Sequence, residues 1–166
     1  MGAGKTVVGK RLAKSLGLSF YDLDAEIEMR YKMSVSAIFQ NFDESCFRKL
    51  ETETLKMFSE KDDCIVSCGG GTPCFNDNMS LINSLGVSVY IKMPAKALAN
   101  RIINSHKKRP LASGKTESEL VDYVEKTLAV REPFYAMANI SVDGINLDKN
   151  ELSEKIRQML GKSLKD

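Results

Sequence analysis

The chain has 166 residues, which is enough for one domain with a sizeable core and too few for two. Hydrophobic residues make up 43% and charged residues 28%, as in ordinary globular proteins, and a net charge of +2 is too weak to indicate nucleic-acid binding. No apolar stretch approaches the roughly 20 residues that cross a bilayer, and the start does not resemble a signal peptide, so we expect a cytoplasmic protein without a membrane partner.

Helices and strands are expected to alternate through the first half of the chain. Apolar side chains recur at helical spacing from Val8 to Leu16, and Gly17 follows as a stop signal. The other expected elements are, in chain order, a strand over 19–21, a helix over 25–32, a short helix capped by Ser34, a helix capped by Asp43 and a buried strand over 64–67.

The second half continues this alternation. Its expected elements are a helix over 76–85, a strand over 87–93, a helix over 95–104, an exposed loop over 105–115, a helix opened by the capping box of Thr116 and Glu119, a strand over 140–142, and a last helix that is capped by Asp148 and faces inward with Leu152, Ile156, Met159 and Leu160. Strands separated by helices favour βαβ units. We therefore expect an α/β fold, with a parallel β-sheet flanked by helices on both faces.

The opening MGAGKT, at residues 1–6, matches the second half of the phosphate-binding P-loop pattern GxxxxGK[ST]. Glycines let successive backbone N–H groups point at phosphate oxygens, and the following helix presents its positive end to the same anion. In this pattern Lys5 reaches the β- and γ-phosphates and the Thr6 hydroxyl binds Mg²⁺. A flexible glycine-rich terminus is the alternative, but the helix expected over 8–17 favours the P-loop.

The first glycine of that pattern, and the strand that normally leads into the loop, would precede Met1. The sequence therefore predicts a parallel sheet that lacks its first, central strand. We expect the natural chain to start upstream; a native start at Met1 would put the complete fold in doubt.

Several polar residues follow the expected strands, where ligands bind in open α/β sheets. Asp22 and Asp24 stand two positions apart and can point to one side, to hold Mg²⁺ through water or accept a hydrogen bond from a hydroxyl; a helix cap with a solvated neighbour is an equally good interpretation. Arg131 falls in phase with a buried helical stripe and so needs an anion. Arg48 and Glu51 form an i,i+3 pair of the kind usual on surfaces.

Taken in order, these segments resemble the shikimate kinase family. The matching segments are MGAGKT at 1–6, DLD at 22–24, FRKLE at 47–51, SCGGG at 67–71, RPL at 109–111 and REPFY at 131–135. The resemblance implies a three-layer P-loop kinase fold in a single domain over 1–166. It also implies ATP-dependent phosphorylation of the 3-hydroxyl of shikimate to shikimate 3-phosphate and ADP, with ATP and Mg²⁺ as cofactors.

The resemblance also implies roles for individual residues. Catalytic roles are implied for Lys5, Asp24 and Arg109, the last in a lid loop over about 105–116. Shikimate would be bound by Asp24, Arg48, Gly70, Gly71 and Arg131. ATP would be bound by Gly2, Ala3, Gly4, Lys5, Thr6 and Arg109, with Arg101 near the adenine, and the magnesium ion by Thr6 and Asp22, with Ser67 close by. Family members are often monomers, so a monomer is expected.

Two other functions remain open. Another P-loop kinase of small metabolites, acting on gluconate or a nucleoside monophosphate, would share the loop and the fold but would lack the combination of Asp24, Arg48 and Arg131. A nucleotide-binding module without catalysis would fit the incomplete P-loop. Turnover distinguishes these possibilities, since all of them bind nucleotide.

Overall fold

The structure is a computed structural model that describes residues 2–105 and 115–161. Its helices are α1 Lys5–Leu16, α2 Leu23–Tyr31, α3 Val35–Asn41, α4 Glu44–Lys56, α5 Asn78–Leu85, α6 Ala95–Ile103, α7 Glu117–Tyr135 and α8 Lys149–Leu160, with 3₁₀ turns at Met57–Glu60 and Thr72–Cys74. Its strands are β1 Ser19–Asp22, β2 Cys64–Ser67, β3 Val89–Lys92 and β4 Ile140–Asp143. Within this described part, none of the helices is long and apolar enough to cross a membrane.

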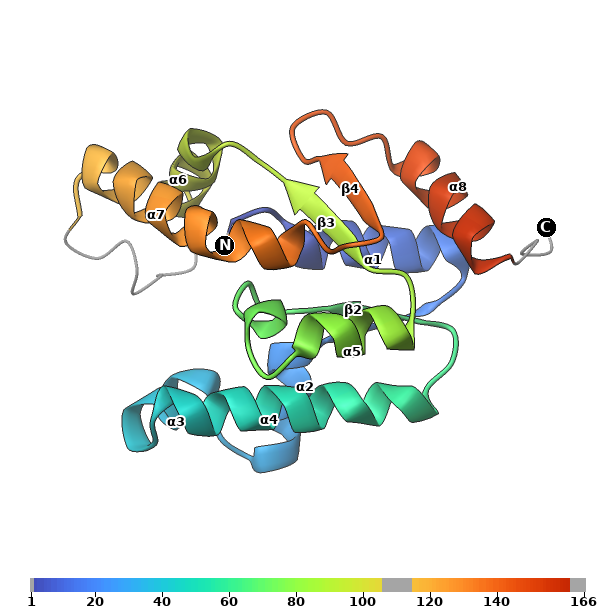
Figure 1. The fold of residues 1–166 in the computed structure, drawn as a ribbon, viewed down its shortest axis with the longest axis horizontal. Coiled ribbons are helices and arrows are strands. Elements are labelled where there is room, and N and C mark those ends of the chain that lie inside the picture. The colour runs from blue at the N-terminus through green and yellow to red at the C-terminus, as the bar shows by residue number, and fades with distance from the viewer. Residues whose placement is uncertain (1, 106–114, 162–166) are drawn as a thin grey trace.

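The four described strands form two separate parallel pairs, β1 with β2 and β3 with β4. Figure 1 shows the arrows of β3 and β4 side by side. In the first pair Asp22 lies opposite Ser67, so the polar residues that end both strands are neighbours. The described strands therefore do not join into one continuous sheet, in agreement with the predicted lack of a central strand. The strand over 64–67 is less buried than its apolar sequence predicts, because only Ser67 is buried and the residues before it are half-buried in a two-stranded sheet.

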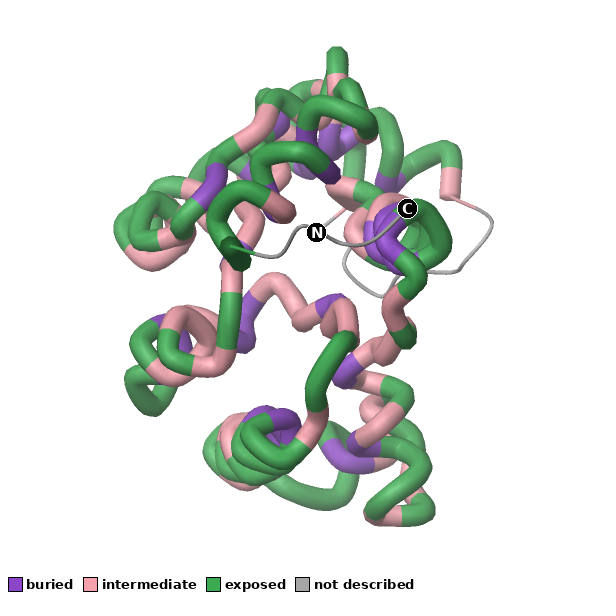
Figure 2. Tube along the Cα trace, turned by 90° about the vertical axis from the view of Figure 1, so that its right-hand side faces the viewer, coloured by how far each residue is buried: buried purple, intermediate pink, exposed green. Residues whose placement is uncertain are grey.

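Helix α1 joins the two strand pairs through one shared cluster of apolar side chains. Leu12 and Leu16 of α1 pack in this cluster with Ile65 of β2, Ile140 of β4 and Leu152 of α8. A second cluster is centred on α2, α3 and α4, and a third on α6 and α7. Figure 2 shows buried positions recurring between exposed ones along the helices, as expected for amphipathic helices that cover a core.

The sequence-based helix ends are largely confirmed. Gly17 ends α1 with a left-handed φ of +69°, which glycine adopts without steric cost. Ser34 and Asp43 accept hydrogen bonds from the backbone N–H groups of Ala37 and Cys46, so both cap their helices as predicted. Thr116 and Glu119 form the predicted capping box at the start of α7.

Two helix starts and the buried face of one helix differ from the predictions. Helix α2 begins at Leu23 rather than near residue 25, so Asp24 belongs to a helix and not to the end of a strand. Helix α5 begins at residue 78, because residues 76 and 77 have left-handed φ values of +52° and +55° after a 3₁₀ turn. In α8, Met159 and Leu160 are 52% and 40% exposed, since the helix contacts the core only as far as Ile156.

Candidate active site

The P-loop segment has the backbone that an anion-binding loop needs. Gly2 and Gly4 have φ values of +63° and +82°, a region that residues with side chains rarely adopt. The Gly4 carbonyl accepts the first helical hydrogen bond, from the Val8 N–H at 3.0 Å, so α1 begins directly after the loop. The helix therefore presents its positive end where the loop would hold a phosphate.

Thr6, at the start of α1, lies against the end of β1. Its hydroxyl donates a hydrogen bond to the Asp22 carboxylate, with 3.0 Å between Thr6 Oγ1 and Asp22 Oδ2. Ser67 faces Asp22 across the strand pair. The three residues that the sequence associates with magnesium are thus brought together by α1, β1 and β2, and Thr6 and Asp22 are the two that could hold the ion.

Asp24 lies in the first turn of α2, close to four charged residues, Lys5, Asp22, Glu28 and Glu51. Burial raises the pKa of its carboxyl group above the ordinary value, and the negative charges of Asp22 and Glu51 raise that pKa further. The positive charge of Lys5 acts in the opposite direction. Asp24 therefore lies near enough to the P-loop lysine and to three other carboxylates for their charges to act on it.

Arg48 projects from α4 and is held at two edges of its guanidinium group. Nη1 donates to Glu51 Oε2 at 2.5 Å, while Nε and Nη2 donate to Glu44 Oε1 at 3.1 and 2.7 Å. The two carboxylates differ sharply in environment, since the Glu51 side chain is 1% exposed and that of Glu44 is 58% exposed. The Thr72 hydroxyl also donates to Glu51, at 2.5 Å. Glu51 is thus a buried anchor for Arg48, and the surface pair suggested by the sequence is wrong.

The glycines at 69–71 allow the loop after β2 to approach these side chains closely. A Cβ atom on Gly69 would lie 3.2 Å from Glu51 Oε1 and 3.5 Å from Asp24 Oδ1, so both carboxylates reach the same point. A Cβ atom on Gly71 would lie 2.7 Å from Arg48 Nη2, so a side chain at this position would require the Arg48 guanidinium group to move. The glycines therefore leave room for Arg48 and expose backbone beside it.

Arg131 belongs to α7, the helix that contacts the turn after the glycine loop. Its positive charge acts on the Cys74 thiol, as does that of Arg48, so both arginines lie near Cys74. One turn along α7, the Tyr135 hydroxyl donates to the Gly70 carbonyl at 2.5 Å, which fixes the loop to the helix. The structure thus brings together the predicted substrate-binding residues from four separate segments.

Arg101 of α6 lies beside the P-loop. Its Nη1 atom is 3.3 Å from the Ala3 carbonyl oxygen and 3.1 Å from Met93 Sδ. Met93 lines a hollow of about 340 Å³ at the carboxyl ends of β3 and β4. Arg101 therefore links the phosphate loop to a hollow at the strand ends. Arg109 and most of the expected lid loop lie outside the described residues.

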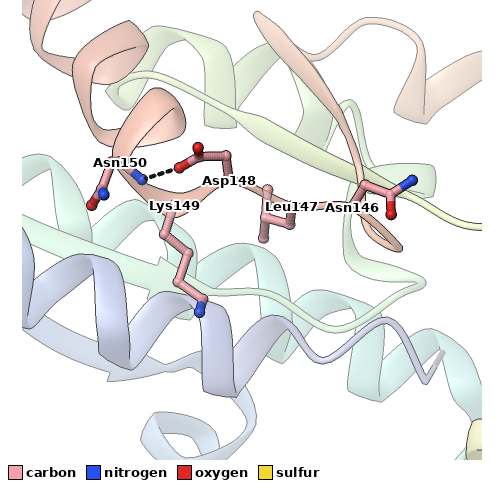
Figure 3. Close-up of a pocket in the computed structure, with 5 residues that line it drawn as sticks. All are labelled: Asn146, Leu147, Asp148, Lys149 and Asn150. Carbon is pink, nitrogen blue, oxygen red and sulfur yellow. Dashed lines mark hydrogen bonds between the residues drawn. The ribbon is translucent and has the colours of Figure 1, made fainter.

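A further hollow of about 470 Å³ lies at the beginning of α8 and is lined by residues 146–150. Figure 3 shows the Asp148 carboxylate turned toward the backbone N–H of Asn150, to which it is hydrogen-bonded at 2.8 Å. Asp148 also accepts a hydrogen bond from the Glu151 N–H, so its carboxylate caps α8. Five consecutive residues form this hollow, and none of them belongs to the site described above.

Sequence reasoning missed the supporting residues Glu51, Thr72 and Tyr135. A signal for Glu51 was available, because it stands four residues after Phe47 and three before Thr54 on the buried side of α4. A charged residue in phase with such a stripe needs a partner. No comparable signal marked Tyr135, whose partner lies 65 residues away in sequence.

A family model described as "Shikimate kinase" matches residues 1–161. Among curated proteins, the shikimate kinase of Parabacteroides distasonis is 42% identical over 96% of this chain and 95% of its own length, and that of Bacteroides fragilis is 38% identical over 96% and 89%. The crystal structure of shikimate kinase from Bacteroides thetaiotaomicron matches with a TM-score of 0.88 and 34% identity over 98% of this chain and 94% of that one.

The solved structure of the shikimate kinase from Acinetobacter baumannii, in complex with shikimate, also matches, with a TM-score of 0.79 and 30% identity over 99% of this chain and 91% of that one. These matches show an α/β P-loop kinase fold and extend over nearly all of the residues that form the site. The chain belongs to the shikimate kinase family.

Proposed function

We propose that this protein transfers the γ-phosphoryl group of ATP to the 3-hydroxyl of shikimate. The observation that carries the proposal is the convergence of Asp24, Arg48 and Arg131 around the glycine loop, on the side reached by the charge of Lys5. A hydroxylated carboxylic acid needs such a set, because guanidinium groups hold its carboxylate and an acidic side chain receives its hydroxyl. The relatives and solved structures named above support the same substrate.

In this proposal the P-loop holds the nucleotide. Backbone N–H groups of residues 2–6 face the phosphates, and Lys5 neutralises charge on the transferring group. Thr6 and Asp22 would hold Mg²⁺, since the Thr6 hydroxyl and the Asp22 carboxylate already lie 3.0 Å apart, and the ion would offset the negative charge of the phosphates. The hollow beside Arg101 and Met93 is the proposed place of the nucleobase.

On the substrate side, Arg48 and Arg131 clamp the carboxylate while Gly70 and Gly71 offer backbone contacts. Asp24 accepts a hydrogen bond from the reacting hydroxyl and is the group that receives its proton. Its raised pKa brings the carboxylate closer to the basicity of a proton acceptor, and the hydrogen bond orients the hydroxyl toward the phosphate. Phosphoryl transfer depends mainly on alignment and charge neutralisation, which this arrangement supplies.

A coupled ADP-release assay tests the proposal. We expect turnover with shikimate, and at least about tenfold lower kcat/KM with gluconate or nucleoside monophosphates, because these lack the matching hydroxyl and carboxylate pattern. The Lys5→Ala variant serves as the control for contaminating kinases. Nucleotide binding without turnover on any substrate would favour the non-catalytic module, and preferred turnover of gluconate or a nucleotide would favour the other kinases.

We further propose that the chain is a single kinase domain over 1–166 that works as a cytoplasmic monomer. The family match extends through residue 161, and all four cysteines are free, as is usual for a reducing compartment. Size-exclusion chromatography with light scattering should give the mass of one chain. A dimer mass would contradict the monomer.

A further inference from the structure

We propose that Phe75 is a positioning residue: its ring holds the Arg48 guanidinium group in the orientation that binds the substrate carboxylate. The Cζ atom of Arg48 lies 4.2 Å from the centre of the Phe75 ring, which is within the range of a cation–π contact. This inference rests on the proposed function, because it assigns Arg48 the substrate carboxylate as its ligand.

Arg48 makes two kinds of contact through its guanidinium group. Its Cζ atom lies over the Phe75 ring, 4.2 Å from the ring centre, and 5.3 Å from the centre of the Phe47 ring, while its N–H groups donate hydrogen bonds to Glu51 and Glu44. An aromatic ring on the face leaves the in-plane N–H donors available, and those donors are what a carboxylate recognises. The ring therefore restricts the orientation of the group without competing with an anion.

The position of the Phe75 ring is imposed by the loop that carries it. The side-chain amide of the next residue, Asn76, donates to the Arg48 carbonyl at 3.2 Å and to Thr52 Oγ1 at 3.1 Å. The Phe75 carbonyl accepts a hydrogen bond from the Asn78 N–H at 2.9 Å. The loop is thus bound to the backbone of the same residue whose side chain the ring covers.

This arrangement matters when the substrate replaces Glu44. Glu44 occupies the Nε–Nη2 edge, a pair of parallel donors that suits a carboxylate, and its side chain is 58% exposed. When the substrate carboxylate takes over this edge, the contacts with Glu51 and Phe75 remain. These two contacts keep the Arg48 N–H donors in the same orientation while the substrate carboxylate replaces Glu44. The Arg48 side chain therefore loses less orientational freedom when the substrate binds.

The expected effect is on shikimate binding. Replacing the ring by an aliphatic side chain of similar size removes the cation–π contact and should raise the shikimate KM roughly 3- to 30-fold. The KM for ATP should change less than about twofold, because the Phe75 ring acts through Arg48, a residue of the substrate side in this proposal, and kcat at saturating shikimate should remain within about threefold.

The experiment compares Phe75→Leu, Phe75→Tyr and wild-type protein in the ADP-release assay, with thermal unfolding measured for each. Leucine keeps the apolar volume without the π-face, whereas tyrosine keeps the π-face, so only the leucine variant should show the raised shikimate KM. Phe42→Leu is the matched control, since Phe42 is also an exposed phenylalanine, 51% against 37% for Phe75. Its kinetics should equal those of the wild type.

The outcomes separate this inference from the proposed function. An active wild type together with an unchanged shikimate KM in Phe75→Leu would overturn the positioning role alone. Equal impairment of the leucine and tyrosine variants, or parallel rises of both KM values with a lowered Tm, would show a general packing role and overturn it as well. A wild type without shikimate turnover would overturn both.

Discussion

The buried carboxylate of Glu51 offers the sharpest test of how the site is held together. Both Glu51 and Glu44 contact the Arg48 guanidinium, from the same helix, but their side chains are 1% and 58% exposed. Removing one partner of a buried, hydrogen-bonded ion pair costs about 3–5 kcal/mol in general, whereas an exposed pair at i,i+4 contributes about 0.3–0.5 kcal/mol. The same guanidinium therefore allows burial to be compared with exposure directly.

For Glu51→Ala we expect a loss of about 3 kcal/mol in the free energy of unfolding, because Arg48 keeps Glu44 but Thr72 also loses its acceptor. In a chain of this size each kcal/mol lowers Tm by about 2–4 °C, so Tm should fall by about 6–12 °C. Glu44→Ala, the matched control, should lower Tm by no more than about 2 °C.

Calorimetric or fluorescence unfolding of the wild type and both variants at neutral pH provides the measurement. Equal Tm losses in the two variants would refute the reasoning, since burial would then make no difference. The shikimate KM gives a second reading. It should rise in Glu51→Ala, because the guanidinium loses its fixed contact, and should hold or fall in Glu44→Ala, where a competitor for the Nε–Nη2 edge is removed.

Three further predictions concern the other site residues. Lys5→Ala should abolish ADP release while Tm changes little; retained activity would exclude the P-loop from the reaction. Arg131→Ala should raise the shikimate KM by at least about tenfold and the ATP KM far less. Steady-state rates measured while both substrate concentrations are varied give the two KM values, and a larger rise in the ATP KM would contradict the prediction. Asp24→Asn should lower kcat yet raise Tm at neutral pH. The folded-state pKa of Asp24 is raised, so the stability cost grows as pH rises from the ordinary pKa of about 3.9 to the folded-state pKa and is complete above it. The Tm gain should therefore shrink as pH falls toward about 4, and a gain independent of pH would contradict this reasoning.

Local signals explain why so much of the fold could be predicted. The helix caps at Ser34, Asp43 and Thr116 bind backbone groups no more than three residues away, so the neighbouring sequence is sufficient to predict them. Gly17 and Gly86 follow the helices that they end. These helices alternate with short apolar strands along the sequence, and this alternation predicts the α/β class. The prediction does not depend on which strands pair with one another.

Placement across the chain was harder to predict. Asp24 was expected beside Asp22 at the end of a strand, but the helix starts two residues earlier than predicted, and the two carboxylates become neighbours through the first turn of α2. Residues 76 and 77 were expected in a helix, but the loop that contains them is drawn onto α4 by Asn76. In the second case a contact with a residue distant in sequence outweighed the local helical preference.

The sequence by itself determined the α/β class, the P-loop at its start, the helix caps and the family to which the chain belongs, because each depends on residue types at short, regular spacings. Only the tertiary structure decided that Glu51 is buried under Arg48, that Phe75 covers the same guanidinium, and that Tyr135 binds the Gly70 carbonyl. These contacts join segments that are dozens of residues apart or depend on which face of a helix the fold covers. The burial of a side chain and its contacts with distant segments of the same chain arise only when the helices and strands pack together.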